Sequence, residues 1–126
     1  MSVVPTSTIL DSVILIDYLN AIPQARTFVD GLSDPCISVI TVSEVLVGVS
    51  TPQHAPTWAF LQTFPILPID TAIAIEAVHL RRQHRWKLPD ALQAALATHH
   101  GITLATRNHK DFNPASFPNV LLPYTI

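Results

Sequence analysis

The sequence predicts an α/β domain built on a mainly parallel β-sheet. Short apolar runs of strand-like composition alternate with longer segments of helical periodicity, and scattered prolines separate them. The length of 126 residues suits one compact domain, so we expect residues 1–126 to form a single unit. A hydrophobic content of 48% is enough to fill a core, and this excludes a disordered chain.

The first half of the chain begins with a predicted strand at residues 8–10 and a helix at about 13–19. A second helix over 24–32 follows Pro23. Residues 36–40 predict the second strand and residues 42–49 the helix after it. A broken helical pattern over 57–63 then leads into a short strand at 66–69.

The second half begins with Thr71, a suitable N-cap for a long helix that continues to about Trp86. Pro89 interrupts this pattern. Residues 90–100 form another predicted helix, which ends at Gly101, a residue typical of helix C-termini. Residues 102–106 predict the next strand and residues 120–122 a short last one. This alternation of strands and helices is what a parallel sheet requires.

Charge and cysteine content limit the classes of function. The net charge of −2 gives no overall attraction to nucleic acid, so RNA binding would require a local basic patch. Cys36 is the single cysteine, which excludes an intrachain disulfide and a cysteine-based zinc site and fits a reducing compartment. Residues 1–7 lack a signal-peptide pattern, and no apolar run is long enough to cross a membrane, so we expect a cytoplasmic protein.

Only 13% of the residues are charged. A surface so poor in charge favours a partner protein or a second copy of the chain that covers part of its apolar area.

Four carboxylates lie where the predicted strands end, which is the edge where ligands bind in parallel α/β sheets. Asp11 directly follows the first strand, and Glu44 lies in the first turn of the helix after the second strand. Asp90 starts the helix that runs back to feed the strand at 102–106, which places it at the same edge. Asp111 comes shortly after that strand ends. We expect these four side chains to meet at one edge of the sheet.

Four acids in one place raise one another's pKa unless a positive charge lies between them. Mg²⁺ prefers oxygen ligands, keeps several waters and often binds through a few carboxylates together with substrate phosphate. Such a site polarises a phosphate and lowers the pKa of a bound water. The arrangement therefore predicts metal-assisted hydrolysis of phosphodiesters.

Each carboxylate also has a simpler explanation. Asp11 is a good helix N-cap, and Asp90 suits the positive end of a helix dipole. Thr41 and Glu44 have the spacing of a capping box. Asp111 is compatible with an ordinary loop position. The predicted site therefore depends on the common placement of the four acids, not on any one of them.

Four segments resemble the motifs of one known family, the PIN-domain nucleases, and within it the VapC-like toxins of type II toxin–antitoxin systems. They occur in the family order and span nearly the whole chain: ILDSVILI (9–16), ITVSEV (40–45), LPDALQAA (88–95) and LATRNHKDF (104–112). Ser12 stands where relatives often carry Thr followed by Asn. The next residue here is Val13, so the family's polar contact at that position is not carried over.

The resemblance implies a PIN-like three-layer α/β/α sandwich with a central, mainly parallel sheet. It also implies an endoribonuclease that depends on Mg²⁺ or Mn²⁺ and cuts RNA such as tRNA or rRNA. Its implied partners are a second copy in a homodimer and a cognate antitoxin that covers the acidic pocket. The implied catalytic and metal-binding residues are Asp11, Glu44, Asp90 and Asp111, and residues that support or orient them are Ser12, Thr106 and Asn108.

Cations near the predicted edge are candidates for RNA contacts. Arg107 and Lys110 flank the last motif, and Arg85 and Lys87 belong to a dense basic stretch that precedes the third. Trp86 in this stretch could stack on a base. A solvated helix end, where positive charge suits the C-terminal dipole, is the simpler explanation of the stretch and is slightly favoured.

Two other groups are expected to be structural. Asp17 lies in the helix after Asp11 and is interpreted as a surface or ion-pair residue, not a metal ligand. An aromatic group near the middle of the chain fits either an apolar partner surface or the core; its members are Trp58, Phe60, Leu61 and Phe64.

Two alternative functions fit the same fold. One is a PIN-fold nuclease that processes RNA without an antitoxin, and the other is a catalytically silent PIN-fold module that binds a protein. A P-loop or dinucleotide site is excluded because Gly31, Gly48 and Gly101 are the only glycines and cannot build either motif. A phosphoacceptor receiver domain would need a paired acidic cluster after the first strand and a phosphorylated Asp after a middle strand, and neither can be placed in this sequence.

Overall fold

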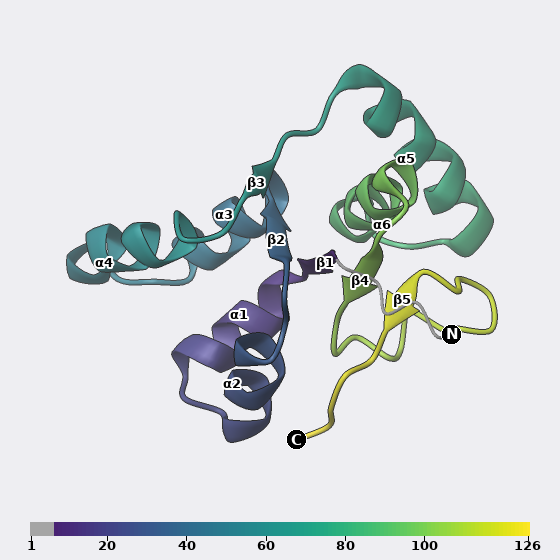
Figure 1. Cartoon of the computed structure of the whole chain (residues 1–126). Helices are drawn as coiled ribbons and strands as arrows, with labels where there is room; N and C mark the ends of the chain where they lie inside the picture. Colours follow the sequence, from purple (N-terminus) through teal and green to yellow (C-terminus); the bar gives the residue numbers. More distant parts are fainter. Residues whose placement is uncertain (1–6) are drawn as a thin grey trace.

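The computed structural model describes residues 7–126. Residues 1–6, which hold most of the segment without a signal-peptide pattern, lie outside the described part of the chain. Figure 1 shows the elements, whose order and bounds are β1 (Thr8–Leu10), α1 (Ser12–Leu19), α2 (Pro23–Asp30), β2 (Pro35–Ser38), α3 (Val39–Val47), α4 (Thr51–Leu61), β3 (Ile66–Leu67), α5 (Thr71–His84), α6 (Leu88–His100), β4 (Thr103–Ala105) and β5 (Val120–Leu121). Between residues 7 and 126, no helix has the length and hydrophobicity needed to cross a bilayer.

The five strands form one sheet in the order β3-β2-β1-β4-β5, and every neighbouring pair is parallel. The central strand is β1, where Ile9 lies opposite Cys36 of β2 and Leu104 of β4. The chain leaves β1 toward β2 on one side and returns later to β4 on the other. This makes the boundary between β1 and β4 a topological switch point, and ligands bind outside the carboxyl ends of strands at such points.

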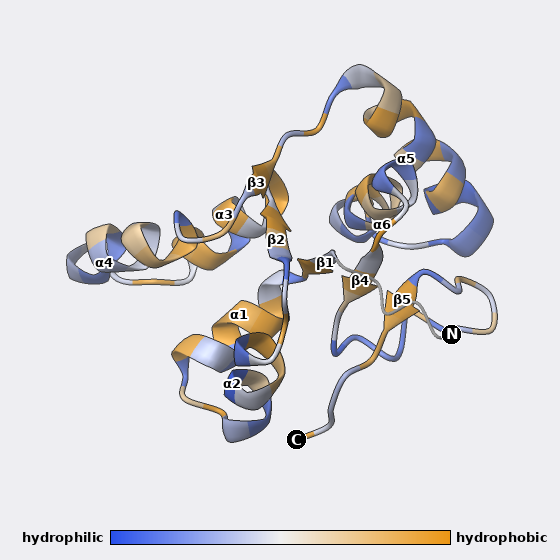
Figure 2. Ribbon diagram, viewed as in Figure 1, coloured by the Kyte–Doolittle hydropathy of each residue, from blue (hydrophilic) through white to orange (hydrophobic). Residues whose placement is uncertain are grey.

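Helices cover both faces of the sheet, which makes the predicted three-layer α/β/α sandwich (Figure 1). Side chains of a strand alternate between faces, so Ile9 joins the core beneath α5 and α6, whereas Leu10 joins the core beneath α1 to α4. Hydrophobic segments follow this plan in Figure 2, where α1, α3 and β2 are largely hydrophobic and α5 mixes both kinds of residue.

The predicted boundary between the second strand and its helix was wrong by about three residues. Ser38 ends β2 and caps α3, because its Oγ accepts a hydrogen bond from the Thr41 amide at 3.1 Å. Val39 and Ile40, which the sequence assigned to the strand, therefore form the first helical turn. Glu44 moves to the second turn, and Thr41 is a residue of the helix, so the capping-box explanation of Glu44 does not hold.

Prolines interrupt the helices less than predicted. Pro89 lies in the first turn of α6, where its missing N–H would have had no helical partner. α4 is one continuous helix over Thr51–Leu61 with Pro56 inside it, not the broken segment expected at 57–63. The helix tolerates Pro56 because the carbonyl that loses its partner lies in the exposed first turn. The N-cap of α5 is Asp70, one residue before the predicted Thr71, and its Oδ1 accepts from the Ile73 amide at 2.9 Å.

α5 and α6 are joined by a tight turn that brings the end of one helix to the start of the other. Arg85 ends α5 in the left-handed region at φ 59°, and Gly101 ends α6 at φ 64°, as its residue type predicted. Trp86 in the turn is 3% exposed and stacks on His84 with ring centroids 4.1 Å apart. A buried Trp86 has no free face for an RNA base, so that alternative was wrong.

The aromatic group of α4 and its C-terminal loop belongs to the core. Leu61 and Phe64 are buried, and Trp58 and Phe60 pack against the same cluster beneath the sheet. This decides between the two explanations that the sequence left open for these residues.

Candidate active site

Asp11 lies at the carboxyl end of the central strand, between β1 and α1. Its backbone is extended (φ −67°, ψ 155°) and its amide donates to the carbonyl of Ala105 in β4 at 2.9 Å, which fixes it over the switch point. The side chain is 6% exposed. Its Oδ1 accepts from the Ser12 amide at 2.8 Å, so Asp11 is also the N-cap of α1. The simple explanation of this residue is therefore correct and does not compete with a role in a site.

The Asp11 carboxylate is held from two sides. Thr106 Oγ1 donates to Oδ2 at 2.7 Å, and Gln93 Nε2 lies 3.5 Å from Oδ1. Burial raises the pKa of Asp11, and the hydrogen bonds from Thr106, Ser12 and Gln93 partly oppose that rise. The protein thus fixes the orientation of this carboxylate before any ligand arrives.

Glu44 approaches Asp11 from α3. The Ser12 hydroxyl donates to Glu44 Oε1 at 3.0 Å, while the Ser12 amide binds Asp11. One residue therefore joins the two acids. Burial raises the pKa of Glu44, and the negative charge of Asp11 raises it further.

Asp90 lies in the first turn of α6, which is the end of that helix near the switch point. Burial raises its pKa to about 6, and the negative charges of Asp11, Asp111 and Glu44 add to the rise, whereas Lys87 opposes it. The charges that act on Asp90 come from three other segments of the chain, namely the end of β1, α3 and the loop after β4.

Asp111 is the exposed member of the group and lies in the loop after β4. Asn108 Nδ2 donates to its Oδ2 at 2.8 Å, and the Asn108 amide donates to Thr106 Oγ1 at 3.1 Å. The Trp86 indole donates to the Asp111 carbonyl at 2.6 Å, which ties this loop to the turn between α5 and α6. Ser12, Thr106 and Asn108 each donate a side-chain hydrogen bond to a carboxylate of this group, and their supporting role stays a prediction.

Gln93 is a residue of this site that the sequence analysis missed. It lies one turn after Asp90 on α6, is 1% exposed, and donates from Nε2 to Thr41 Oγ1 at 2.7 Å. The Thr41 hydroxyl in turn donates a hydrogen bond to the Leu10 carbonyl at 3.1 Å. Gln93 Oε1 is buried without a hydrogen-bond partner among the described residues. A buried orphan acceptor is costly, so a polar residue here needs a purpose, and its contact with Asp11 supplies one.

The donor set suits a hard divalent cation, because it consists of carboxylates, and burial together with their mutual repulsion raises the pKa of Asp90 to about 6. Within residues 7–126, however, no three His, Cys, Asp or Glu side chains stand close enough together to form a complete ligand set. An ion here would therefore be held by one or two carboxylates and by water, with the others acting through water or charge. This is the usual coordination of Mg²⁺.

Arg107 is less available to RNA than predicted. Its Nε and Nη2 donate to the two carboxylate oxygens of Asp17 at 2.7 and 3.1 Å, and the Tyr124 hydroxyl donates to Asp17 Oδ2 at 2.9 Å. Asp17 is 5% exposed, so the expectation of an ion-pair residue is correct, whereas that of a surface residue is wrong. A buried carboxylate needs such partners.

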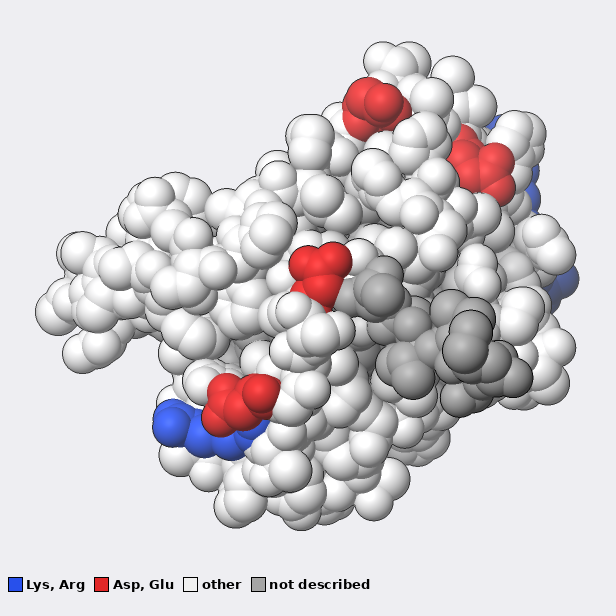
Figure 3. Space-filling view, in the orientation of Figure 1, with Lys and Arg blue, Asp and Glu red and all other residues white. Residues whose placement is uncertain are grey.

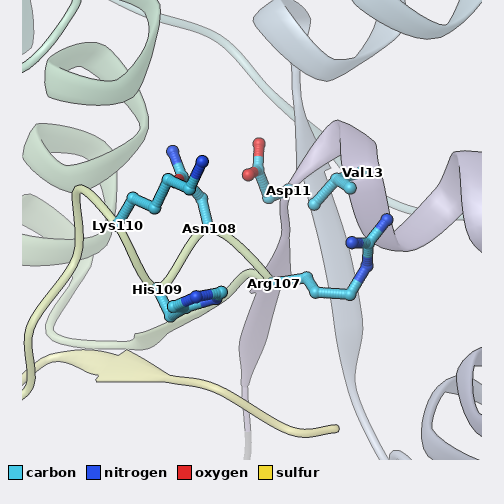
Figure 4. A pocket seen from close by; sticks show the side chains of 6 residues that line it. All are labelled: Asp11, Val13, Arg107, Asn108, His109 and Lys110. Atoms are coloured by element: carbon cyan, nitrogen blue, oxygen red, sulfur yellow. The ribbon is translucent and has the colours of Figure 1, made fainter. Parts of the chain in front are cut away.

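A pocket of about 370 Å³ opens beside Asp11 (Figure 4). Asp11 lies between its two sides in this view. Val13 and Arg107 lie on one side, and Asn108, His109 and Lys110 lie on the other. The pocket thus adjoins the acidic group and is bordered by cationic and amide side chains of the loop after β4.

Residues 8–117 match the PIN domain family, and this match covers most of the chain. The chain belongs to the PIN-domain family. The acidic group at the switch point of this PIN domain is formed by residues that the four family-like motifs contain.

The PIN domain is similar to ribonuclease VapC10 of Mycobacterium tuberculosis, with 32% identity over 108 residues, or 79% of this chain and 81% of that protein. It also resembles a solved chain of a toxin–antitoxin complex from Klebsiella pneumoniae, at 38% identity and a TM-score of 0.88, covering 94% and 99% of the two chains. VapBC2 from Rickettsia felis, bound to a promoter DNA fragment, shares the fold at 22% identity and a TM-score of 0.74, covering 91% and 96%. The chain is a VapC-like PIN domain.

Proposed function

We propose that this VapC-like PIN domain is an endoribonuclease that depends on Mg²⁺ or Mn²⁺ and is the toxin of a type II toxin–antitoxin pair. The observation that carries the proposal is the convergence of Asp11, Glu44, Asp90 and Asp111 at the switch point, where burial and the charges of the other three raise the pKa of Asp90. A group of acids that repel one another gains stability from a divalent cation between them, and RNA phosphate is a natural further ligand of such an ion.

In this proposal, Asp11, Glu44 and Asp90 hold the cation directly or through water, and Asp111 completes the acidic pocket. A bound cation supplies positive charge that polarises the phosphodiester and lowers the pKa of an attacking water. Thr106 and Ser12 keep the two buried acids in place, because they donate to Asp11 Oδ2 and Glu44 Oε1. The buried position of Asp11 limits the competition of bulk water for its carboxylate.

RNA must approach an acidic pocket, so cations have to neutralise its phosphates nearby. We propose Lys110, Lys87 and Arg85 for this role, together with the part of Arg107 that Asp17 leaves free. Lys87 is close enough to lower the pKa of Asp90, and Lys110 borders the pocket beside Asp11. The face shown in Figure 3 is less suitable, because its Lys and Arg side chains are confined to the margins, over α2 and beside α5.

A cognate antitoxin and a second copy of the chain are the proposed protein partners. Apolar side chains are exposed on several helices, with Val47 of α3 at 85% and Ile75 of α5 at 56%. The similar chain from Klebsiella pneumoniae comes from a toxin–antitoxin complex, which supports the same kind of partner here. A cytoplasmic location follows from a role on cellular RNA.

The test is cleavage of labelled tRNA and ribosomal RNA by the purified chain with Mg²⁺, with Mn²⁺ and with EDTA. Asp90→Asn removes one acid of the group, and Glu76→Gln makes the same chemical change on α5, outside it. We expect cation-dependent cleavage by the wild type and by Glu76→Gln, and none by Asp90→Asn.

Equal behaviour of the wild type and Asp90→Asn, in folded protein free of inhibitor, would favour a catalytically silent binding module. Cation-dependent cleavage without any copurifying or genetically linked inhibitor would instead favour RNA processing without an antitoxin.

A further inference from the structure

We propose that the pocket beside Asp11 binds one nucleotide of the RNA, next to the phosphodiester that is cut. This proposal rests on the proposed function and adds a subsite to it. The pocket is lined by Asp11, Val13, Arg107, Asn108, His109 and Lys110, and its volume is about 370 Å³. That is at the lower end of the range of about 300–1,000 Å³ for small-molecule sites, and suits a single nucleotide.

The pocket has two chemically different sides (Figure 4). Asn108, His109 and Lys110 offer hydrogen-bond donors and positive charge to a phosphate or ribose. Among the described residues, the side chains of His109 and Lys110 take part in no ion pair, since the one ion pair found there joins Arg107 to Asp17. Both residues are exposed, so they are free to bind a ligand.

The opposite side suits a base. Val13 is apolar and lines the pocket, so it offers a surface for a ring to pack against. Arg107 lies beside it with a planar guanidinium, a group on which bases stack. Val13 and Arg107 come from α1 and from the loop after β4, so the pocket spans the switch point.

Arg107 is held in place before any ligand binds. Asp17 accepts from its Nε and Nη2, Tyr124 supports Asp17, and Nη1 is left for a further partner. A guanidinium fixed in this way loses little conformational freedom when a base or phosphate binds, which favours affinity. The ion pair with Asp17 thus leaves Arg107 less free to bind a phosphate, but it holds the guanidinium in place as a stacking surface of the pocket.

The position of Asp11 sets the direction of the nucleotide. A phosphate avoids the Asp11 carboxylate unless a cation lies between them, so the phosphate to be cut belongs on the Asp11 side, where a cation would bind. The neighbouring phosphate belongs near Lys110 and His109, away from the acids. The base then extends toward Val13 and Arg107.

The experiment is a titration of the ¹⁵N-labelled full chain in EDTA with adenosine 5′-monophosphate, uridine 5′-monophosphate or inorganic phosphate, followed by two-dimensional NMR. We expect both nucleotides to shift the amides of Val13 and of residues 107–110. Inorganic phosphate should shift residues 109–110 alone, and more weakly. Lys110→Gln should weaken nucleotide binding roughly tenfold, the effect of one lost charged hydrogen bond.

Arg82→Gln is the matched control, because Arg82 is exposed in the last turn of α5 and loses the same charge outside the pocket. It should bind nucleotides as the wild type does. Equal weakening by Lys110→Gln and Arg82→Gln would overturn the subsite, as would shifts confined to the turn between α5 and α6. His109→Gln repeats the test at a second exposed position of the same loop.

The two proposals fail separately. A chain that binds nucleotides at residues 107–110 but cuts no RNA contradicts the proposed nuclease function and leaves the subsite standing. A chain that cuts RNA with Mg²⁺, but whose pocket amides do not move with either nucleotide, contradicts the subsite only.

Discussion

Asp11 and Asp90 belong to one acidic group, yet the protein treats them differently. Asp11, at the end of β1, is 6% exposed and accepts hydrogen bonds from Ser12, Thr106 and Gln93. Asp90, at the start of α6, receives no hydrogen bond from the described residues, and its pKa rises to about 6 through burial and the charges of the other acids. Asp11 is therefore positioned by the fold, whereas Asp90 is the acid whose charge the proposed cation would stabilise most.

The strongest test of this difference between Asp11 and Asp90 is to replace each of them with Asn. Both Asp11→Asn and Asp90→Asn should lower RNA cleavage by at least about a hundredfold, in line with the loss of one essential charge in a preorganised site. Their effects on the metal-free protein should have opposite signs. Asp11→Asn should lower the free energy of unfolding by about 1–3 kcal/mol. The Asn side chain has one acceptor oxygen, so its NH₂ group would lie against either the Ser12 amide or the Thr106 hydroxyl, which both donate to Asp11.

Asp90→Asn should instead raise the melting temperature of the metal-free protein, because it removes a charge that the other acids repel. Thermal unfolding in EDTA measures both changes, with Glu76→Gln as the control. A loss of stability in both variants would show that Asp90, too, is held by the fold.

Gln93→Leu tests whether Gln93 positions the Asp11 carboxylate, because the variant should change cleavage much more than stability. The leucine removes the orphan Oε1 together with the hydrogen bonds from Nε2 to Thr41 and Asp11, so these effects should largely cancel and the free energy of unfolding should change by less than about 1 kcal/mol. It also removes the donor near Asp11 Oδ1, and cleavage should fall roughly 10- to 100-fold, as for other residues that orient metal ligands. Chemical unfolding and single-turnover cleavage together test this. Activity at the wild-type level would mean that Gln93 does not position Asp11.

The pH dependence of the free energy of unfolding tests the raised pKa of Asp90. A carboxyl group whose pKa of about 6 in the folded protein exceeds its ordinary value of 3.8 binds its proton more tightly in the folded state. The free energy of unfolding of the metal-free protein should therefore fall as the pH rises from about 4 to 6 and change little above that range. Asp90→Asn should reduce this slope in urea unfolding at each pH, and the raised pKa values of Asp11 and Glu44 account for the slope that remains. An unchanged slope would assign the effect to another group.

Tyr124→Phe is expected to have the smallest effect. It removes one hydrogen bond to Asp17 and keeps the bidentate pair of Asp17 with Arg107, so the free energy of unfolding should fall by about 1 kcal/mol. Thermal unfolding checks this. A much larger loss would mean that the C-terminal segment is needed to keep Asp17 buried.

The sequence was sufficient to locate the acids because their positions follow from chain order alone. In a parallel sheet, the segments that follow the strands meet at one edge, so Asp11, directly after β1, and Asp111, in the loop after β4, could be placed there without knowing any contact. Asp90 could be placed by the direction of the helix that it starts. The alternation of short strands and longer helices likewise predicted the layers, although Ser38 and its cap moved one strand boundary.

The supporting contacts could not be predicted in this way, because they join residues far apart in the sequence. Gln93 and Asp11 are 82 positions apart, and Arg107 and Asp17 are 90 apart. Periodicity does not reveal such pairs. One signal was present: Gln93 lies one turn after Asp90 in a helix whose neighbours are Ala and Leu, and a polar residue in an apolar helix face needs a partner.

The most direct test of the central claim is a Mn²⁺ titration at pH 7.5 and pH 5, followed by electron paramagnetic resonance, of the wild type, Asp90→Asn and Glu76→Gln. If the acidic group holds a divalent cation, the wild type and Glu76→Gln should remove Mn²⁺ from solution at pH 7.5 and much less at pH 5, where Asp90 is mostly protonated. Asp90→Asn should bind weakly at both. Equal binding by all three proteins, or binding that does not weaken at pH 5, would contradict the account.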